Sequence, residues 1–271
     1  MLARAALHFY EEPCISGTRG SGAVFFSGCS LHCIYCQNQE ISTGRVGTVI
    51  SKERLIEIFF ELEEAGAHNI NLVTPTHYTD VLSETLEKAK ACGLSIPFVY
   101  NCGGYESVES LKKLDGLVDI YLTDYKYADS ALAAAFSNAP DYPETAFLAI
   151  QEMVRQTGPC VFDEAGMLKR GVIVRELLLP GHVKNSKDAV RTIYEAFGDR
   201  IFFSLMNQYT PMHKFEKYPE LSRKCTRREY ERLVDYALGL GIRNAFIQEG
   251  GTAKESFIPA FDNTGVTEEN R

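Results

Sequence analysis

Segments with the pattern of β-strands alternate with helical segments along most of this chain of 271 residues. Strands are expected over residues 22–28, 69–74, 96–101, 118–124, 201–206 and 242–248, and a further one ends near 179–181. Helices are expected over residues 51–66, 79–92, 107–114, 130–136, 144–156, 186–197 and 226–240. Residues 160–162 and 171–174 are expected to form a small hairpin about Gly166. The alternation is typical of parallel βαβ units, so it predicts an α/β protein.

Six or seven strands are too few for a complete eight-stranded barrel. The pattern by itself leaves two architectures open, an incomplete barrel and an open doubly wound sheet, and in both of them ligands bind at the carboxyl ends of the strands. No linker divides the sequence, which predicts a single domain over residues 1–271. Its core is expected over about residues 20–250, between a lead-in over 1–19 and an irregular tail over 251–271.

The composition argues against several classes of function. A net charge of −8 does not favour the basic face that binds nucleic acid, and no apolar run approaches the roughly 20 residues that cross a bilayer. The N-terminus lacks the pattern of a signal peptide. These features predict a cytoplasmic protein without nucleic-acid or membrane partners, whose singly scattered cysteines are reduced and mostly buried.

Three cysteines follow the first expected strand within eight residues, with the spacing C-x3-C-x2-C: Cys29, Cys33 and Cys36. Three thiolates on a four-iron cluster leave one iron without a protein ligand, whereas a simple electron carrier supplies four thiolates. Zinc is the first alternative, but zinc sites favour paired C-x2-C knuckles with further ligands later in the chain. Chance is the second, and the polar, glycine-flanked loop argues against it. The triad therefore predicts an iron–sulfur site.

At these residues the sequence resembles the radical S-adenosylmethionine (radical SAM) enzymes, whose motif is C-x3-C-x-aromatic-C. Tyr35 supplies the aromatic residue before Cys36. Residues 16–29 and Asn38 resemble the branch that activates glycyl radical enzymes, and within it the group labelled pyruvate formate-lyase activating enzymes by similarity. Many members of that group carry a further cysteine-rich segment upstream, whereas only Cys14 precedes the triad here.

The resemblance implies a partial (β/α)6 TIM-like barrel with the cluster loop after its first strand. It implies one 4Fe–4S cluster held by the three cysteines, with S-adenosylmethionine (SAM) as the second cofactor. Such an oxidoreductase cleaves SAM to a 5′-deoxyadenosyl radical that abstracts hydrogen from a substrate. The substrate is a glycyl radical enzyme in the activase interpretation, and a small molecule or peptide in the alternative one. A reductant such as flavodoxin or ferredoxin is the implied electron donor.

The resemblance also implies roles for residues at the strand ends. Asp124 and Lys126 match an Asp-x-Lys pair whose lysine lies near the SAM carboxylate, and Tyr35 is expected near the adenine, largely through its backbone. Thr74 and Thr76 stand where most relatives have a Gly-Gly-Glu segment that binds the SAM amine, which is a departure from the pattern. The residues predicted to contact SAM are Tyr35, Thr74, Thr76, Asn101, Asp124, Lys126 and Arg175.

Plainer interpretations of these residues remain open. Asp124 and Lys126 are also compatible with a solvated ion pair, Arg175 with a structural partner for any carboxylate, and Asn101 with ordinary turn chemistry. A different class of function, a barrel metallohydrolase, would use three histidines near strand ends: His77, His182 and His213. They lack the short spacings that mark zinc sites.

Overall fold

The computed structural model describes residues 1–248 and 259–267, and its central feature is a sheet in the order β1-β2-β3-β4-β5-β7-β8-β9. From β2 to β9 neighbouring strands on this path run parallel, whereas β1 pairs antiparallel with β2. The strands are β1 (Leu2–His8), β2 (Ser21–Phe26), β3 (Ile70–Val73), β4 (Phe98–Cys102), β5 (Ile120–Asp124), β7 (Leu168–Leu177), β8 (Phe202–Met206) and β9 (Ala245–Ile247). The predicted α/β fold with parallel strands is confirmed.

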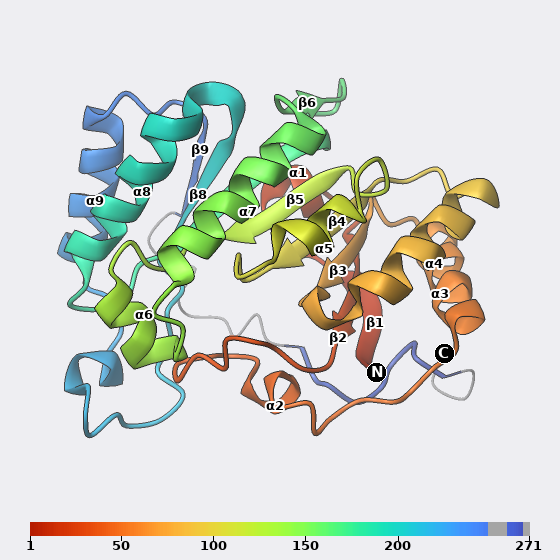
Figure 1. Ribbon diagram of the computed structural model, residues 1–271, viewed down its shortest axis with the longest axis horizontal. Helices are drawn as coiled ribbons and strands as arrows, with labels where there is room; N and C mark the ends of the chain where they lie inside the picture. The colour runs from red at the N-terminus through yellow and green to blue at the C-terminus, as the bar shows by residue number, and fades with distance from the viewer. Residues whose placement is uncertain (249–258, 268–271) are drawn as a thin grey trace.

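Helices connect successive strands, and most of them cover the outer face of the sheet, as Figure 1 shows. They are α1 (Pro13–Ser16), α2 (Gln39–Ser42), α3 (Lys52–Glu64), α4 (Thr79–Ala91), α5 (Val108–Lys112), α6 (Ser130–Ser137), α7 (Tyr142–Thr157), α8 (Val183–Phe197) and α9 (Arg227–Gly239). Short 3-10 turns occur at Thr76–Tyr78, Gly198–Arg200 and Pro219–Ser222. Within the described residues, no helix is both long and apolar enough to cross a membrane.

Local sequence explains where several elements begin. Helix α9 starts at a capping box, in which Thr226 and Glu229 satisfy each other's backbone N–H groups, as their spacing indicates. Helix α7 begins two residues before the predicted start because Pro143 lies in its first turn, where a proline costs no hydrogen bond. Strand β4 begins two residues late, after Pro97, which has no N–H to donate.

The predicted hairpin is present, but with a different second arm. Strand β6 (Val161–Phe162) pairs antiparallel with residues 168–170, the first residues of β7, rather than with 171–174. From Gly171 onward β7 pairs parallel with β5 and β8 and becomes the predicted fifth strand. One strand therefore serves both pairings, which its length of ten residues permits.

The lead-in over residues 1–19 differs from the sequence expectation, because it belongs to the same sheet and enters its concave side. Strand β1 forms the sheet edge. Helix α1 packs Cys14 and Ile15 against inward-facing residues of the parallel strands, among them Val99 and Leu122. The amide of Asn69 donates to the carbonyl of Ile15 at 2.8 Å. The segment thus fills the amino-terminal end of the partial barrel.

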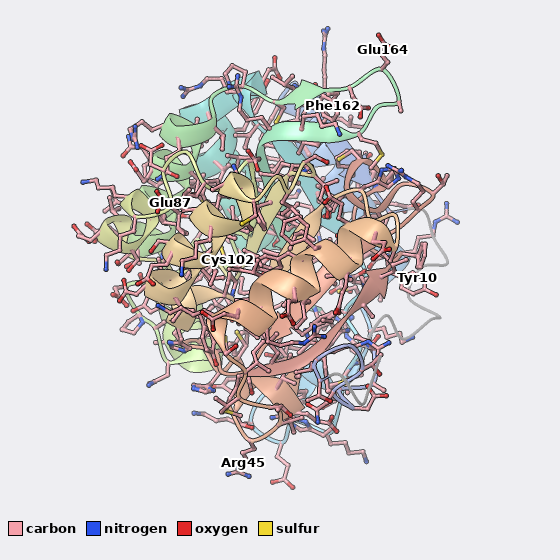
Figure 2. All side chains as sticks on the ribbon, turned by 90° about the vertical axis from the view of Figure 1, so that its right-hand side faces the viewer. Tyr10, Arg45, Glu87, Cys102, Phe162 and Glu164 are labelled. Carbon is pink, nitrogen blue, oxygen red and sulfur yellow. The ribbon has the colours of Figure 1, made fainter. Side chains whose placement is uncertain are left out.

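The carboxyl ends of the strands lie opposite that plug. Figure 2 shows Phe162 and Glu164 of the β6–β7 hairpin at one end of the molecule and Arg45, in the loop after α2, at the other. The hairpin marks the amino ends of the strands, and Arg45 follows the carboxyl end of β2. In parallel α/β folds ligands bind at the carboxyl ends of the strands, so a functional site is expected at this end of the molecule.

Candidate functional site

The cysteine loop begins where β2 ends. Gly28 has a φ of +97°, a conformation that glycine adopts without strain, and it turns the chain out of the strand. Its N–H donates to the carbonyl of Ile41 at 2.8 Å, and the N–H of Cys29 donates to that of Ser42 at 3.0 Å. Both acceptors belong to α2, which therefore fixes the loop at the edge of the sheet.

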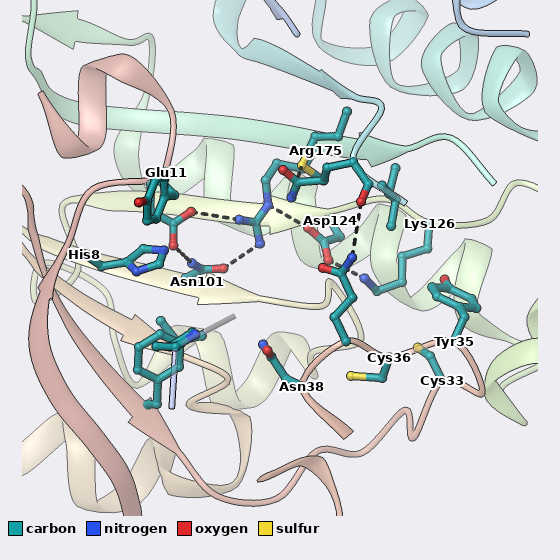
Figure 3. A pocket seen from close by; sticks show the side chains of 18 residues that line it. His8, Glu11, Cys33, Tyr35, Cys36, Asn38, Asn101, Asp124, Lys126 and Arg175 are labelled. Atoms are coloured by element: carbon teal, nitrogen blue, oxygen red, sulfur yellow. Dashed lines mark hydrogen bonds and ion pairs between the residues drawn. The ribbon is translucent and has the colours of Figure 1, made fainter. Parts of the chain in front are cut away.

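Residues predicted from the sequence converge on one cavity at this end of the sheet. It has a volume of about 160 Å³, and the predicted residues that line it are Cys29, Cys33, Cys36, Thr74, Asn101, Asp124, Lys126 and Arg175. A second cavity, of about 220 Å³, shares several of these side chains and is also lined by Tyr35, as Figure 3 shows. Of the predicted residues, Thr76 lines neither cavity.

The thiols of Cys33 and Cys36 lie in an environment that favours their neutral form until a metal binds. Burial raises the pKa of Cys33, and the nearby Lys126 ammonium partly opposes that effect. Burial also raises the pKa of Cys36 to about 11. A coordinating metal deprotonates a thiol, so metal binding at this loop releases protons. The hydroxyl of Ser137 lies 3.0 Å from the Cys33 sulfur and donates to it.

A chain of alternating charges crosses the cavity floor (Figure 3). The Arg175 guanidinium donates to Asp124 at 2.8 Å, to the Asn101 side-chain oxygen at 2.6 Å and to Glu11 at 3.3 Å. Asp124 also accepts from the Lys126 ammonium. Glu11 in turn accepts from the amide of Asn101 at 3.1 Å. The charged side chains of this network are between 12% and 17% exposed, so their charges are largely shielded from water.

The network keeps its members charged despite their burial. Burial alone would raise the pKa of Asp124, but Arg175 and Lys126 outweigh it and hold that pKa below its ordinary value. Burial acts to lower the pKa of Lys126, and Asp124 with Cys33 raises it above its ordinary value. Asp124 and Lys126 therefore form a buried pair tied to Arg175, not the solvated ion pair that was the plainer interpretation.

Tyr142 on α7 fixes the backbone around this network. Its hydroxyl oxygen accepts from the N–H of Lys126 at 3.0 Å, and it lies 2.8 Å from the carbonyl oxygen of Gly103, to which it donates. It also lies 3.1 Å from the carbonyl oxygen of Asp124. One buried hydroxyl thus joins the segments that follow β4 and β5.

Replacing Tyr142 by phenylalanine is expected to lower the free energy of unfolding by about 1–3 kcal/mol, because the buried Lys126 N–H loses its acceptor. Urea denaturation of the two proteins measures this difference. Tyr194→Phe is the matched control, since the Tyr194 hydroxyl also donates to a carbonyl, that of Gly241 at 3.2 Å, but lies at the surface. Equal stability of Y142F and wild type would contradict this role of the hydroxyl.

Thr74 and Thr76, which stand where most relatives have a Gly-Gly-Glu segment, have different surroundings in the structure. Thr74 lines the cavity with a φ of +58°, in the left-handed region that β-branched residues rarely adopt. The Thr76 hydroxyl instead donates to Glu106 at 2.6 Å. Burial raises the pKa of Glu106 to about 7, against opposing hydrogen bonds from Thr76 and Tyr100. At this segment Thr74, not Thr76, is the residue placed to meet a ligand.

The three histidines of the alternative interpretation have separate surroundings. His77 lies beside Gly28, His182 lies 3.4 Å from Glu220, and His213 stacks on Phe215. Across residues 1–248 and 259–267, no three His, Cys, Asp or Glu side chains approach closely enough to hold a single metal ion. The metallohydrolase interpretation therefore lacks a site in the described part of the chain.

The thiols are nevertheless suited to a cluster. In a four-iron cluster each cysteine binds a different iron, so the three sulfurs need not converge on one point. They line one cavity together with two cations, Lys126 and Arg175, and one carboxylate, Asp124, so the charged side chains of this cavity carry a net positive charge beside a thiolate-bound cluster. The donor set and the charge of the cavity fit a 4Fe–4S group.

Sequence reasoning missed the residues that reach the site from other layers. Glu11 comes from the lead-in, Tyr142 from α7 and Ser137 from α6. None of them lies at the carboxyl end of a parallel strand, where the sequence places the predicted ligand-binding residues. No spacing or motif in the sequence marks them.

Comparison with known families and proteins adds independent information. Residues 16–135 match the family described as a 4Fe-4S single cluster domain, and this range contains the whole cysteine loop. The chain is 27% identical over 239 residues to an uncharacterized protein of Methanocaldococcus jannaschii, covering 85% of this chain and 65% of that protein. The chain thus spans somewhat less than two thirds of the length of this relative.

Solved structures share the fold at low sequence identity. A radical SAM methyltransferase from Sphaerobacter thermophilus is 16% identical with a TM-score of 0.57, over 84% of this chain and 66% of the other. SuiB of Streptococcus suis, solved bound to S-adenosylmethionine, is 14% identical with a TM-score of 0.55, over 86% and 53%. The predicted partial barrel is confirmed by this likeness. The fold of this chain is therefore that of these solved structures.

Proposed function

We propose that the protein is a radical SAM enzyme whose single 4Fe–4S cluster is held by Cys29, Cys33 and Cys36. When bound and reduced, the cluster would supply one electron to the sulfonium of SAM, and cleavage of the bond from sulfur to the 5′ carbon would give methionine and a 5′-deoxyadenosyl radical. The radical takes a hydrogen atom from the substrate and becomes 5′-deoxyadenosine. Flavodoxin or ferredoxin is the proposed class of reductant.

The observation that carries this proposal is the cavity shared by the three thiols and the buried Asp124–Lys126 pair. SAM brings a carboxylate and an amine, so its site needs a cation and acceptors beside the cluster. Within the described residues Asp124 is the hydrogen-bond acceptor of the Lys126 ammonium, whose other N–H groups are available to a ligand carboxylate. Thr74, Asn101 and Arg175 line the same cavity and complete the proposed set of contacts.

Tyr35 has a different role in this proposal from that of a stacking residue. Its ring is buried and its hydroxyl lies 2.8 Å from that of Tyr127, so the ring does not offer a free face to an adenine. Its place in the loop supports contact with SAM through the backbone, as the resemblance implies. The side chain serves the packing beneath the cysteines.

The proposed reaction predicts that protein reconstituted anaerobically with iron and sulfide, then reduced and given SAM, forms 5′-deoxyadenosine. Product is measured by chromatography and mass spectrometry, and the cluster by iron content and by electron paramagnetic resonance (EPR). A control lacking reductant should give no product. A fully loaded and reduced cluster that leaves SAM intact would contradict the proposal.

The finer proposal is that the substrate is a glycyl radical enzyme, which this protein would activate. It is supported by the resemblance of residues 16–29 and Asn38 to activases, and Asn38 lines both cavities. A glycyl-radical doublet in the EPR spectrum of a candidate partner, dependent on SAM, would support it. SAM cleavage coupled to a small molecule or peptide, with no such doublet, would favour the alternative substrate class.

A further inference from the structure

A buried serine donates a hydrogen bond to one of the proposed cluster ligands. Ser137, the last residue of α6, is 4% exposed, and its hydroxyl oxygen lies 3.0 Å from the sulfur of Cys33. The serine is 104 residues away from the cysteine in sequence. The contact therefore depends on how α6 packs against the loop.

The serine is itself the end of a chain of hydroxyl groups. Its oxygen lies 2.7 Å from the hydroxyl of Tyr127, which lies 2.8 Å from the hydroxyl of Tyr35. Both tyrosines are buried. Burial raises the pKa of each tyrosine well above its ordinary value, so both hydroxyls keep their protons.

The direction of every hydrogen bond follows once Cys33 is a thiolate. A thiolate has no proton, so Ser137 must donate its single hydroxyl proton to the sulfur. The serine oxygen can then only accept, which makes Tyr127 the donor to Ser137. The Tyr127 oxygen in turn accepts from Tyr35. All three O–H dipoles point toward the cluster ligand.

We propose that Ser137, supported by Tyr127 and Tyr35, raises the reduction potential of the cluster through its hydrogen bond to Cys33. The inference rests on the proposed function, because it requires Cys33 to be a cluster ligand. Reduction adds negative charge that spreads onto the thiolates, so a donor to sulfur stabilises the reduced form more than the oxidised form. Aligned hydrogen bonds polarise one another and gain about 10–30% per bond, so each tyrosine adds a smaller contribution.

Tyr35, the aromatic residue of the cysteine loop, belongs to the same hydrogen-bond chain. Tyr35 is adjacent to Cys36, yet its hydroxyl reaches Tyr127, on the segment that follows β5. Its ring packs on Phe136, the neighbour of Ser137, at a centroid distance of 6.3 Å. The loop thereby carries both a ligand and the far end of the hydrogen-bond chain that acts on another ligand.

The test is an EPR-monitored redox titration of the reconstituted protein and its variants. Ser137→Ala is expected to shift the midpoint to a more negative potential, so that the ratio of reduced to oxidised cluster at the wild-type midpoint falls about tenfold, or 59 mV for a one-electron couple. Tyr127→Phe should shift it less and Tyr35→Phe least, all with the same sign. Ser137→Thr keeps the hydroxyl and should restore the wild-type potential.

Tyr209→Phe is the matched control. The Tyr209 ring packs on Tyr35 at 6.2 Å, but its hydroxyl donates to the carbonyl of Leu221 at 2.6 Å, outside the chain. Removing it costs a buried hydroxyl and should leave the potential unchanged. Iron content and melting temperature, measured for each variant, separate an effect on the potential from a loss of structure.

The outcomes are distinguishable. A wild-type protein that assembles no 4Fe–4S cluster would overturn the proposed function and this inference with it. A normal wild-type cluster together with a wild-type potential in S137A would overturn the inference alone. If S137A fails to assemble a cluster, Tyr127→Phe decides, because it leaves the serine in place, and an unchanged potential in that variant would overturn the role of the chain.

Discussion

Replacing Cys33 by alanine is expected to abolish cluster binding and SAM cleavage together. Cys33 is buried between the loop and α6, and no other thiol of the loop can take its place without moving the backbone held by Gly28 and Cys29. With only two thiolates left, two of the four irons would lack a protein ligand. We expect iron content to fall to background and formation of 5′-deoxyadenosine to fall at least a thousandfold.

Cys102 provides the control for this experiment. It lines the same cavity and is also buried, but it lies at the end of β4, and its thiol donates to the Thr123 hydroxyl at 3.4 Å. If the loop alone supplies the ligands, Cys102→Ala keeps its full iron content and its activity. Loss of one quarter or more of the iron in C102A would mean that Cys102 is a fourth ligand, and the open iron of the proposed mechanism would then be wrong.

Asp124→Asn is expected to destabilise the fold by about 3 kcal/mol or more, because it leaves the buried Lys126 ammonium without its carboxylate and leaves Arg175 with Glu11 alone. Urea denaturation at pH 7 measures the change. Asp80→Asn is the control, since Asp80 pairs with Lys113 at the surface, where its side chain is 80% exposed, and such pairs contribute little. Comparable losses in the two variants would contradict the buried character of the network.

The stability difference between wild type and D124N should depend on pH in one direction. The folded pKa of Asp124 lies below the unfolded value of about 3.9. A depressed carboxyl pKa gives stability that is complete above the unfolded pKa and is lost as the pH falls through the folded pKa. The difference should therefore be constant from pH 7 to about pH 5 and shrink below pH 4. A difference that grows as the pH falls would show the opposite sign and contradict the assignment.

Much of the fold could be predicted because its helices and strands repeat a local pattern. The buried residues of α3 are apolar and recur at helical spacing on one face: Leu55, Ile58, Phe59 and Leu62. Strand β1 was not predicted, because it pairs antiparallel with β2 and so lies outside the alternation of parallel strands and helices from which the fold was predicted. The start of α7 differs from the prediction because Pro143 fits its first turn, and the start of β4 differs because Pro97 has no N–H to donate.

The residues of the candidate site that follow parallel strands could be predicted, because the carboxyl ends of those strands lie at the same edge of the sheet. Asp124, Lys126 and Arg175 follow or end parallel strands, so topology alone brings them to one edge of the sheet. Thr76 was misplaced by the same rule, because the 3-10 turn after β3 rotates its side chain toward Glu106. Glu11 could not be predicted, since its carboxylate meets Arg175 only after the lead-in enters the barrel.

The sequence by itself predicted an iron–sulfur site, because the spacing of three cysteines on one loop is a local property that needs no tertiary contact to be recognised. It also determined the alternation of strands and helices, which is set by residue periodicity. Only the tertiary structure decided which distant side chains surround the thiols. Burial and hydrogen bonding between Ser137 and Cys33, or between Arg175 and Glu11, arise from packing across more than 100 residues of chain, and no local pattern encodes such a contact.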